Sequence, residues 1–437
     1  MKRYEKYKPT GIQWLPEIPE HWNIESFGKH FSFGKGLPIT KADLTKEGIA
    51  VISYGQVHSK LNLGVTLSDS LIRYVSNRWL DTNPQNLLRK CDFVFADTSE
   101  DIAGAGNYAF NDYSKPLFAG YHIVIARPTM VENSHYWAYL FQSNCWKSQV
   151  QSLVNGVKVY SINKSILKKT AILIPSIAEQ EKIVAYLDKR ITLIDNCKCQ
   201  RERELQTLNE LKQAEIASVV TRGLNPDVPM KDSGIFWQPL IPMNWSVTKL
   251  KHVLSKLDRP RRPDDELLVC SNSGDVKKRG DSKLGLVADS DEIYQGVRCG
   301  DLLIHGMDTW HGAIAVSNYD GMCTPVVHVC DSTQNKKYIA LYLRNMANQK
   351  VFKLISNGVR QNTSDFRSWG KVGTILIPIP PIEEQNAIVE YIESKTNKID
   401  TMIEALKAEI DRLTEYKQRL ISDVVTGQID VRGEQIQ

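Results

Sequence analysis

The sequence of 437 residues lacks any apolar run that approaches the ~20 residues needed by a membrane-spanning helix. Its first residues, MKRYEKYKPTG, also lack the apolar core of a secretory signal peptide. Both absences predict a cytoplasmic protein that makes no membrane contact. The length exceeds what one compact core usually serves, so two to four domains are expected.

Clustered cysteines are missing as well. The eight cysteines are scattered, no pair has CxxC spacing, and the closest two are Cys197 and Cys199. A zinc site or a disulfide framework would need tighter and repeated spacing. The sequence therefore predicts reduced thiols, no metal site and no cofactor bound by this chain.

Signatures of catalysis are also scarce. There is no phosphate-binding GxxxxGK[ST] motif, Gly104 and Gly106 lack the third glycine of a dinucleotide loop, and the Asn-Pro-Pro-Tyr motif of amino-methyltransferases does not occur. His305 and His311 flank GMDTW without further ligands, which favours loop or contact residues over metal ligands. We expect a chain that performs no catalysis.

One alternative is an autonomous Mg²⁺-dependent nuclease. Within residues 263–277, Pro263 and Asp264 precede Asp275 and Lys277 in the loose pattern PD-(D/E)xK. In such a site the carboxylates hold Mg²⁺ and the lysine stabilises the attacked phosphate. The pattern is common by chance, and SNSGDVKKRG is typical of an exposed polar turn. The nuclease is therefore the less favoured hypothesis.

What the chain does contain is an internal repeat. IPSIAEQEKIVAYLDKRITLID from Ile174 returns 205 residues later as IPPIEEQNAIVEYIESKTNKID from Ile379. GIQWLPEIPEHW from Gly11 likewise returns as GIFWQPLIPMNW from Gly234. The order is motif, block and helical segment, and then the same three again. The blocks align only in short pieces such as CDFVFADT and GDLLIHGMDT. The motif and the helical segment, which together we call the frame, are therefore duplicated, whereas the blocks, which are inserts in this frame, have diverged.

Both repeated segments are predicted as long helices. Each begins at proline and contains no further Pro or Gly until Gly223 and Gly427. The second segment has apolar residues at spacings of three and four, which favours a partner helix. Lys198 and Arg201 interrupt this seam in the first segment. An antiparallel pair within the chain is expected, with the weaker seam on the first helix.

The two blocks between these segments are predicted as mixed α/β globules, since short apolar runs alternate with turn signals. Residues 23–173 hold 16 Lys or Arg against 11 Asp or Glu, and residues 246–376 hold 19 against 14. Residues 377–437 are acidic, with 7 against 12. Two basic blocks on a less basic frame suit a polyanion that is contacted at two places.

Polar, aromatic and basic side chains at the predicted turns of the blocks are the candidate DNA contacts. Arg, Gln and Asn can bind base edges, whereas Lys and Ser mainly contact phosphates. For each residue taken alone, a solvated loop position is at least as good an interpretation. The candidates are Lys35, Tyr54, Gln56, His58, Lys60, Lys158 and Tyr160 in the first block, and Lys277, Lys278, Arg279, Trp310, His311, Arg360, Gln361 and Asn362 in the second.

This combination resembles the specificity (S) subunit of type I restriction–modification systems. The likeness rests on IPSIAEQEKIVAYLD and IPIPPIEEQNAIVEYIE, the closing VVTR and VVTG, and the GIQWLPEIPEHW motif with its twin. It implies α/β (mixed α+β) target-recognition domains in tandem half-repeats, separated by a long antiparallel two-helix coiled coil. The implied division is 1–173 target-recognition domain 1, 174–223 central spacer helix, 224–377 target-recognition domain 2, 378–426 distal spacer helix and 427–437 C-terminal tail.

The resemblance also implies a function. The chain would be a non-catalytic subunit that binds an asymmetric, bipartite double-stranded DNA target, with one half-site for each domain and a gap set by the helices. Two methyltransferase subunits would bring S-adenosylmethionine, and restriction or motor subunits would bring ATP and Mg²⁺. Besides the nuclease, the remaining alternative is a coiled-coil interaction scaffold without DNA preference.

Overall fold

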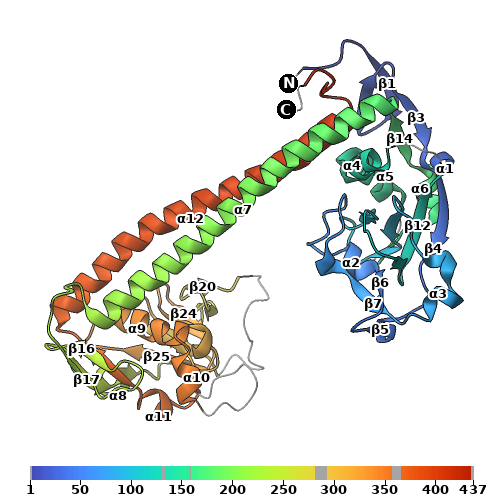
Figure 1. Cartoon of the computed structure of the whole chain (residues 1–437). Coiled ribbons are helices and arrows are strands. Elements are labelled where there is room, and N and C mark those ends of the chain that lie inside the picture. Colours follow the sequence, from blue (N-terminus) through green and yellow to red (C-terminus); the bar gives the residue numbers. More distant parts are fainter. Residues whose placement is uncertain are drawn as a thin grey trace. The chain divides into compact units, whose positions relative to one another are not determined.

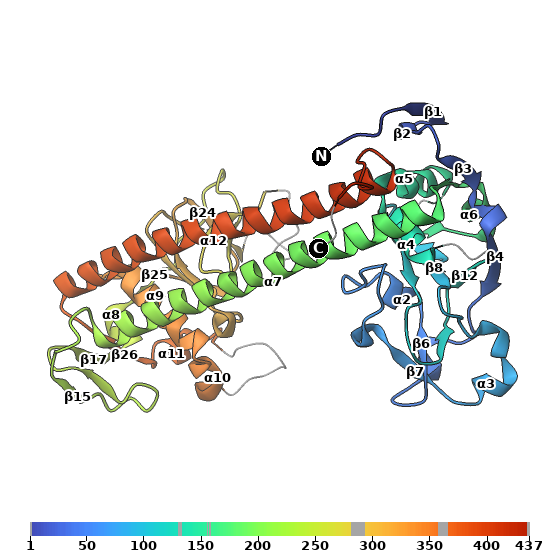
Figure 2. The ribbon, with the colours of Figure 1, turned by 45° about the horizontal axis from the view of Figure 1, so that its top comes forward.

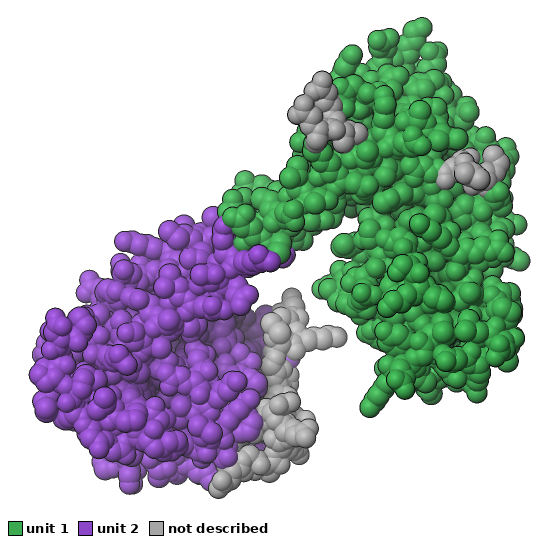
Figure 3. Space-filling view, viewed as in Figure 1, with its two compact units in different colours: residues 1–201, 408–437 green, residues 202–407 purple. Residues whose placement is uncertain are grey.

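The computed structural model describes residues 2–129, 133–154, 156, 159–280, 293–356 and 366–434. Within these ranges no helix is long and apolar enough to cross a membrane. The chain forms two compact units, and Figure 3 colours them separately. Unit 1 comprises Met1–Arg201 and Ala408–Gln437, and unit 2 comprises Glu202–Lys407. These units cut across the repeat, and the domain boundaries drawn from the sequence stay a prediction.

Two long helices contribute to both units. They are α7 (Ile177–Arg222) and α12 (Ile382–Val425), which are drawn in green and red in Figure 1. Both predicted helical repeats are thereby confirmed. Glycine ends each helix with a positive φ, +76° at Gly223 and +71° at Gly427, a conformation that favours glycine.

Within each unit, α7 and α12 run antiparallel. In unit 1, Lys417 Nζ lies 2.8 Å from Asp195 and Arg201 Nε lies 3.0 Å from Glu409. In unit 2, Lys212 Nζ lies 2.6 Å from Asp400. Residue numbers therefore rise along α7 while they fall along α12. Arg201, which interrupts the apolar seam, is used for an ion pair with the partner helix instead.

The intervening blocks consist of short strands and helices, including several 3-10 helices (η). Those of unit 1 are β1 (Tyr7–Ile12), β2 (Leu15–Pro19), β3 (Asn23–Ser26), α1 (Phe27–His30), β4 (Phe31–Lys35), η1 (Lys41–Asp43), β5 (Leu44–Thr45), β6 (Ile49–Ile52), α2 (Tyr54–Val57), η2 (Asp69–Leu71), β7 (Arg73–Val75), α3 (Trp79–Thr82), η3 (Pro84–Asn86), β8 (Phe93–Ala96), β9 (Thr98–Ser99), β10 (Tyr108–Phe110), β11 (Leu117–Ala119), β12 (Ile123–Pro128), α4 (Ser134–Gln142), α5 (Asn144–Leu153), β13 (Tyr160–Ser161), α6 (Lys164–Lys169) and β14 (Ala171–Ile174). Those of unit 2 are β15 (Met230–Asp232), β16 (Leu240–Pro242), β17 (Ser246–Lys249), α8 (Leu250–Val253), β18 (Ser255–Lys256), β19 (Leu268–Cys270), β20 (Val276–Lys278), β21 (Gln295–Val297), β22 (Leu302–His305), η5 (Thr309–His311), β23 (Ile314–Val316), β24 (Gly321–Cys323), β25 (Val327–Asp331), α9 (Lys336–Asn348), α10 (Val351–Ile355), α11 (Trp369–Val372) and β26 (Leu376–Ile379).

One antiparallel sheet recurs in both units. Its order is β10–β8–β12–β4 in unit 1 and β23–β22–β25–β18 in unit 2. Figure 2 shows β8, β12 and β4 side by side. The aligned pieces CDFVFADT and GDLLIHGMDT contain β8 and β22, the strands at the same place in the two sheets. The mixed α/β fold expected from the sequence is confirmed.

The rest of the strand pairing differs between the units. Unit 1 has a second four-stranded sheet, β11–β6–β7–β5, in which β11 and β6 run parallel. At the same stage of the chain, unit 2 has the two-stranded ladders β19–β20 and β21–β24. The divergence of the inserts is therefore a difference in sheet topology as well as in sequence.

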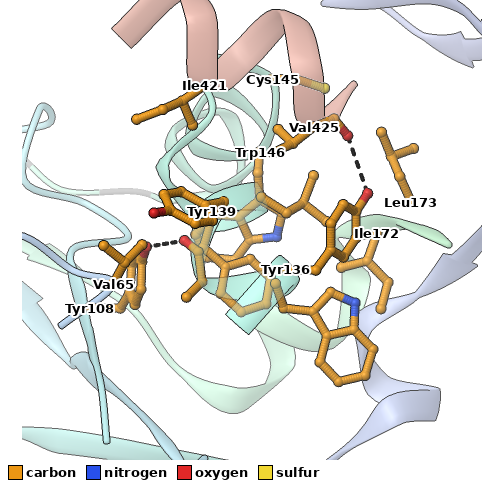
Figure 4. Packing of buried hydrophobic residues seen from close by; sticks show 14 of the residues in the cluster. Val65, Tyr108, Tyr136, Tyr139, Cys145, Trp146, Ile172, Leu173, Ile421 and Val425 are labelled. Atoms are coloured by element: carbon orange, nitrogen blue, oxygen red, sulfur yellow. Dashed lines mark hydrogen bonds between the residues drawn. The ribbon is translucent and has the colours of Figure 1, made fainter. Parts of the chain in front are cut away.

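The cores attach each block to the end of a long helix. In unit 1 the Tyr136 hydroxyl donates to the Val425 carbonyl of α12 at 3.1 Å, and Figure 4 shows this bond among the packed rings. In unit 2 the Tyr338 hydroxyl donates to the Pro378 carbonyl at 3.2 Å and lies 3.5 Å from the Val220 carbonyl of α7. Val220 and Val425 are repeat equivalents. Each block therefore contacts the helix that belongs to the other half of the sequence.

A buried tryptophan and a carboxylate mark the start of each long helix. Trp22 and Trp245 are both fully buried. In unit 2, Trp245 Nε1 donates to Glu384 at 3.1 Å. In unit 1, the Tyr4 hydroxyl donates to the buried Glu179 at 2.6 Å. Since Glu179 and Glu384 lie in the first turns of α7 and α12, their charge also stabilises the positive end of each helix dipole.

Candidate nucleic-acid interface

A cavity of about 670 Å³ opens in unit 1, between α2, the loop after β8 and the residue before β12. Helix α2 is fixed at its start by a capping box, in which the Ser53 backbone N–H donates to Gln56 Oε1 at 3.1 Å. Tyr54, the first residue of α2, and His58, which follows this helix, both line the cavity. The cavity is lined by Tyr54, Gly55, His58, Thr98, Ser99, Glu100, Asp101, Ala103, Gly104, Asn107, His122 and Val159.

Hydrogen bonds fix the imidazole of His58 in this cavity. His58 Nε2 lies 2.8 Å from the Thr98 carbonyl, which can only accept, so Nε2 carries the proton. Asn107 Nδ2 lies 3.1 Å from His58 Nδ1 and donates to it. This pattern of bonds fits the Nε2–H tautomer of the ring, and the Asn107 amide is oriented by it.

His122 lines the same cavity in a strained backbone conformation. Its φ is +55°, which is uncommon for a residue with a side chain. His122 Nδ1 donates to Asp97 at 3.0 Å, and the imidazole side chain is 55% exposed. Its ring meets the Tyr54 ring edge-on at 5.4 Å between centroids. Burial raises the pKa of Tyr121, and the Tyr54 hydroxyl adds to this, so the Tyr121 phenol remains protonated.

Some of the unit 1 residues predicted from the sequence line this cavity, and others do not. Tyr54 and His58 line it, and Tyr160 pairs with the lining residue Ser99 across β9 and β13. The Gln56 side chain is engaged in the cap of α2. Lys35 and Lys60 are exposed at the end of β4 and beyond α2, and neither lines the cavity; Lys158 lies outside the described residues.

In unit 2, three of the predicted residues lie on or beside the β19–β20 hairpin. Lys277 and Lys278 are exposed on β20, opposite Val269 and Leu268. Lys278 Nζ lies 2.7 Å from Glu266 and 5.9 Å from the centre of the Tyr319 ring. Arg279 follows the strand, and its backbone N–H donates to the Leu267 carbonyl. The hairpin therefore presents a basic edge.

The loop after β22 carries the next two predicted residues. Trp310 is partly buried against the core of unit 2, with Lys353 Nζ 5.6 Å from its ring centre, whereas His311 is exposed. His305 Nδ1 accepts the Asp308 backbone N–H at 3.1 Å, and burial lowers the pKa of His305 despite the nearby Asp308 carboxylate. Arg360, Gln361 and Asn362 lie outside the described residues.

The two loops occupy equivalent places in the recurring sheet, since β8 and β22 have the same neighbours. Sequence reasoning found the unit 2 loop through Trp310 and His311 but missed Thr98, Asn107 and His122 in unit 1. The Asp-Thr pair at the end of each aligned piece, with Thr98 in one half and Thr309 in the other, was the signal that could have located both loops.

Comparisons with known proteins agree with this architecture. Residues 20–207 match the family model of the type I restriction modification DNA specificity domain. The chain is 24% identical to a putative type I restriction enzyme MjaX specificity subunit of Methanocaldococcus jannaschii, over 98% of this chain and 97% of that protein. It is 21% identical to the type I restriction enzyme EcoDI specificity subunit of Escherichia coli, over 77% and 79%. The chain is therefore similar to type I specificity subunits over most of its length.

A solved structure supports the fold of the chain. The chain matches one from a study of complex assembly and conformational transition of the type I restriction–modification system, with a TM-score of 0.68 and 15% identity. The match covers 94% of this chain and 99% of the other. The family match itself runs from the residue after β2 into α7, so it includes the unit 1 cavity.

The geometry of unit 2 does not favour the nuclease alternative. The β19–β20 hairpin places Asp275 at its turn, while Asp264 precedes β19 at the opposite end. The Asp275 carboxylate accepts from the Ser273 hydroxyl at 3.0 Å. A shared Mg²⁺ would need both carboxylates within about 2.1 Å of the ion. Among the described residues no group of three or more His, Cys, Asp or Glu side chains could hold a metal ion.

Proposed function

We propose that this chain is a type I specificity subunit that selects an asymmetric, bipartite double-stranded DNA target, with one half-site contacted by the block of each unit. The helices α7 and α12 would set the gap between the half-sites, which must match the ~34 Å turn of the duplex for both blocks to reach the same groove. The chain would choose the sequence and perform none of the chemistry.

One observation carries this proposal. The recurring sheet, the buried tryptophans and the first-turn carboxylates are shared between the halves, whereas the second sheet of unit 1 is replaced by two short ladders in unit 2. A duplicated frame with unlike inserts supports one kind of ligand bound at two unlike sequences. The basic excess of both blocks supports a polyanion as that ligand.

The proposed assembly contains two methyltransferase subunits and restriction or motor subunits. S-adenosylmethionine would be bound by the former, and ATP and Mg²⁺ would be used by the latter. Since the ligand is cellular DNA, we place the chain in the cytoplasm. Phosphate contacts would dominate the affinity, so binding should weaken steeply as salt is raised.

Single-molecule methylation mapping tests the proposal. DNA would be taken from cells expressing this chain with its methyltransferase partner, and from cells with the partner alone. We expect a modified-adenine motif of two unlike halves with a fixed gap, present only when this chain is expressed. No new motif, although both proteins are made and associate, would contradict the proposal and support an interaction scaffold.

A nuclease assay on the purified chain addresses the other alternative. The proposal predicts no Mg²⁺-dependent cleavage of duplex DNA by the wild-type chain. Cleavage that is abolished in Asp275→Ala would assign the 263–277 stretch a catalytic role and overturn the non-catalytic assignment.

A further inference from the structure

The Asn107 side chain is a polar group in the unit 1 cavity that is both oriented and available. One of its amide N–H groups donates to His58 Nδ1 at 3.1 Å, which defines the positions of Nδ2 and Oδ1. Within the described ranges, Asn107 Oδ1 has no hydrogen-bond partner. The second N–H and Oδ1 therefore form an unused donor–acceptor pair on the cavity wall.

This pair is held rigidly from two sides. The Asn107 backbone N–H donates to the Gly104 carbonyl at 3.0 Å, and the Asn107 carbonyl accepts from the Ala96 backbone at 3.2 Å. His58 is fixed in turn by the Thr98 carbonyl at 2.8 Å. A side chain that is oriented before binding loses little conformational entropy when it meets a ligand.

The charge of the cavity favours a base edge over a phosphate. Glu100 and Asp101 line it, and Asp97 beside it holds His122 Nδ1 at 3.0 Å. These carboxylates would repel a phosphate but can accept hydrogen bonds from exocyclic amino groups. Asparagine with a free donor and a free acceptor matches adenine, whose N6 amino group and N7 form the complementary pair in the major groove.

The conformation of His122 is an independent sign that this cavity is specialised. Positive φ at a residue with a side chain costs energy and persists where the surrounding structure enforces it, often at binding sites. The half-exposed imidazole of His122 lines the same cavity as Asn107.

We propose that Asn107 is a specificity-determining residue that contacts a base edge, with preference for adenine, in the half-site bound by unit 1. His58 acts as its positioning residue. This inference rests on the proposed function, since it needs a DNA target for the chain.

The test is methylation mapping of cells that express the methyltransferase partner with wild-type chain, Asn107→Ala, the near-isosteric Asn107→Asp, or the control Asn23→Ala. Asn23 is an exposed asparagine on β3 of the same unit and does not line the cavity. For Asn107→Ala we expect discrimination at one base pair of one half-site to fall about tenfold or more, with every other position unchanged. Asn107→Asp should lose the adenine preference at that pair, because a carboxylate cannot donate to N7.

The remaining outcomes separate the two proposals. A wild-type motif that persists unchanged at every position in Asn107→Asp overturns the role of Asn107 and leaves the proposed function intact. A uniform loss of methylation at all positions in Asn107→Asp, with the chain still folded and bound to its partner, also overturns it, because such a loss indicates a structural role. The absence of any motif with the wild-type chain contradicts the proposed function itself.

His58 supplies a further check. His58→Ala should relax the same single base pair as Asn107→Ala, whereas His58→Gln retains a donor and an acceptor and should restore part of the preference. Relaxation of a different position, or of none, would contradict the positioning role.

Discussion

Units 1 and 2 share a frame and differ in what the frame carries. In both, a buried tryptophan and a first-turn carboxylate mark the start of a long helix, and a buried tyrosine contacts the end of the other long helix. The cores are filled differently. Unit 1 stacks aromatic rings, such as Phe27 on Phe31 at 4.1 Å, whereas unit 2 packs mostly aliphatic side chains around Leu250 and Ile304.

This difference shows which constraints act on each part. The frame must hold two helices whose halves contact each other, so a change on one side requires a matching change on the other. The inserts contact their own core and, in the proposed function, DNA. They can therefore change their packing, their sheets and their loops while the frame persists.

The largest expected effect tests whether the shared frame is energetically equivalent in both units. Trp22→Ala and Trp245→Ala should each lower the free energy of unfolding by about 3–5 kcal/mol, because both leave a large cavity. Urea unfolding followed by circular dichroism measures this. Trp14→Ala is the matched control, since Trp14 is 42% exposed and should change stability by less than about 0.5 kcal/mol. If the substitution of either buried tryptophan changed the free energy of unfolding no more than Trp14→Ala does, the frame would not be energetically equivalent in the two units.

Alanine substitutions of the glycines that end α7 and α12 should lower the stability of the chain by different amounts. A Cβ on Gly427 would lie 2.4 Å from the Pro19 ring, whereas one on Gly223 would meet the flexible end of Glu384 at 2.7 Å. Gly427→Ala should therefore cost more than Gly223→Ala, for which about 1–2 kcal/mol from the positive φ is expected. Thermal unfolding of both measures the difference. Gly11→Ala, with φ +71° and open space, gives the cost of the backbone alone. Equal losses for Gly223 and Gly427 would contradict the packing argument.

The tyrosine contacts to the opposite helix should have smaller and similar effects. Tyr136→Phe and Tyr338→Phe each remove a donor from buried carbonyl groups, which should cost about 1–2 kcal/mol. Chemical unfolding is again the measurement, and Tyr416→Phe, at an exposed position on α12, is the control. If neither substitution changed stability beyond that control, these hydrogen bonds would not hold the blocks to the helices.

The ion pairs between α7 and α12 should have the smallest effects. Lys417→Met and Lys212→Met should each cost about 0.5 kcal/mol, because the pairs are partly exposed. The loss should disappear in 1 M salt, where screening acts over about 3 Å. Lys407→Met removes a pair within α12 and controls for the change in charge. A loss that persists in high salt would indicate packing of the lysine stems instead.

Much of the frame was predictable because its sequence is repeated within the chain. The repeat predicted both helices, and the prolines and glycines beside them predicted the helix ends to within two or three residues of the observed bounds. Each block also contains a pair of successive helices, α4 and α5 in unit 1 and α9 and α10 in unit 2. One pair divides at Ser143 and the other at Gln349 and Lys350, where Lys350 has φ +60°.

The contacts that complete the fold and the site were not predictable in the same way. Tyr136 and Val425 are 289 residues apart, and no local pattern joins them. The order of strands in the second sheet of unit 1 depends on pairing between β11 and β6, which are also distant in sequence. Asn107 follows a glycine-rich loop with no signal of its own, and its orientation depends on His58 from another element.

The central claim is that each unit's block selects its own half of the target. It is tested most directly by replacing residues 224–377 with the corresponding block of the EcoDI specificity subunit and mapping methylated adenines with the original methyltransferase partner. We predict that one half of the motif changes while the other half stays as in the wild-type chain. Simultaneous change of both halves, or of neither, in a folded and partner-bound chimera would contradict the account.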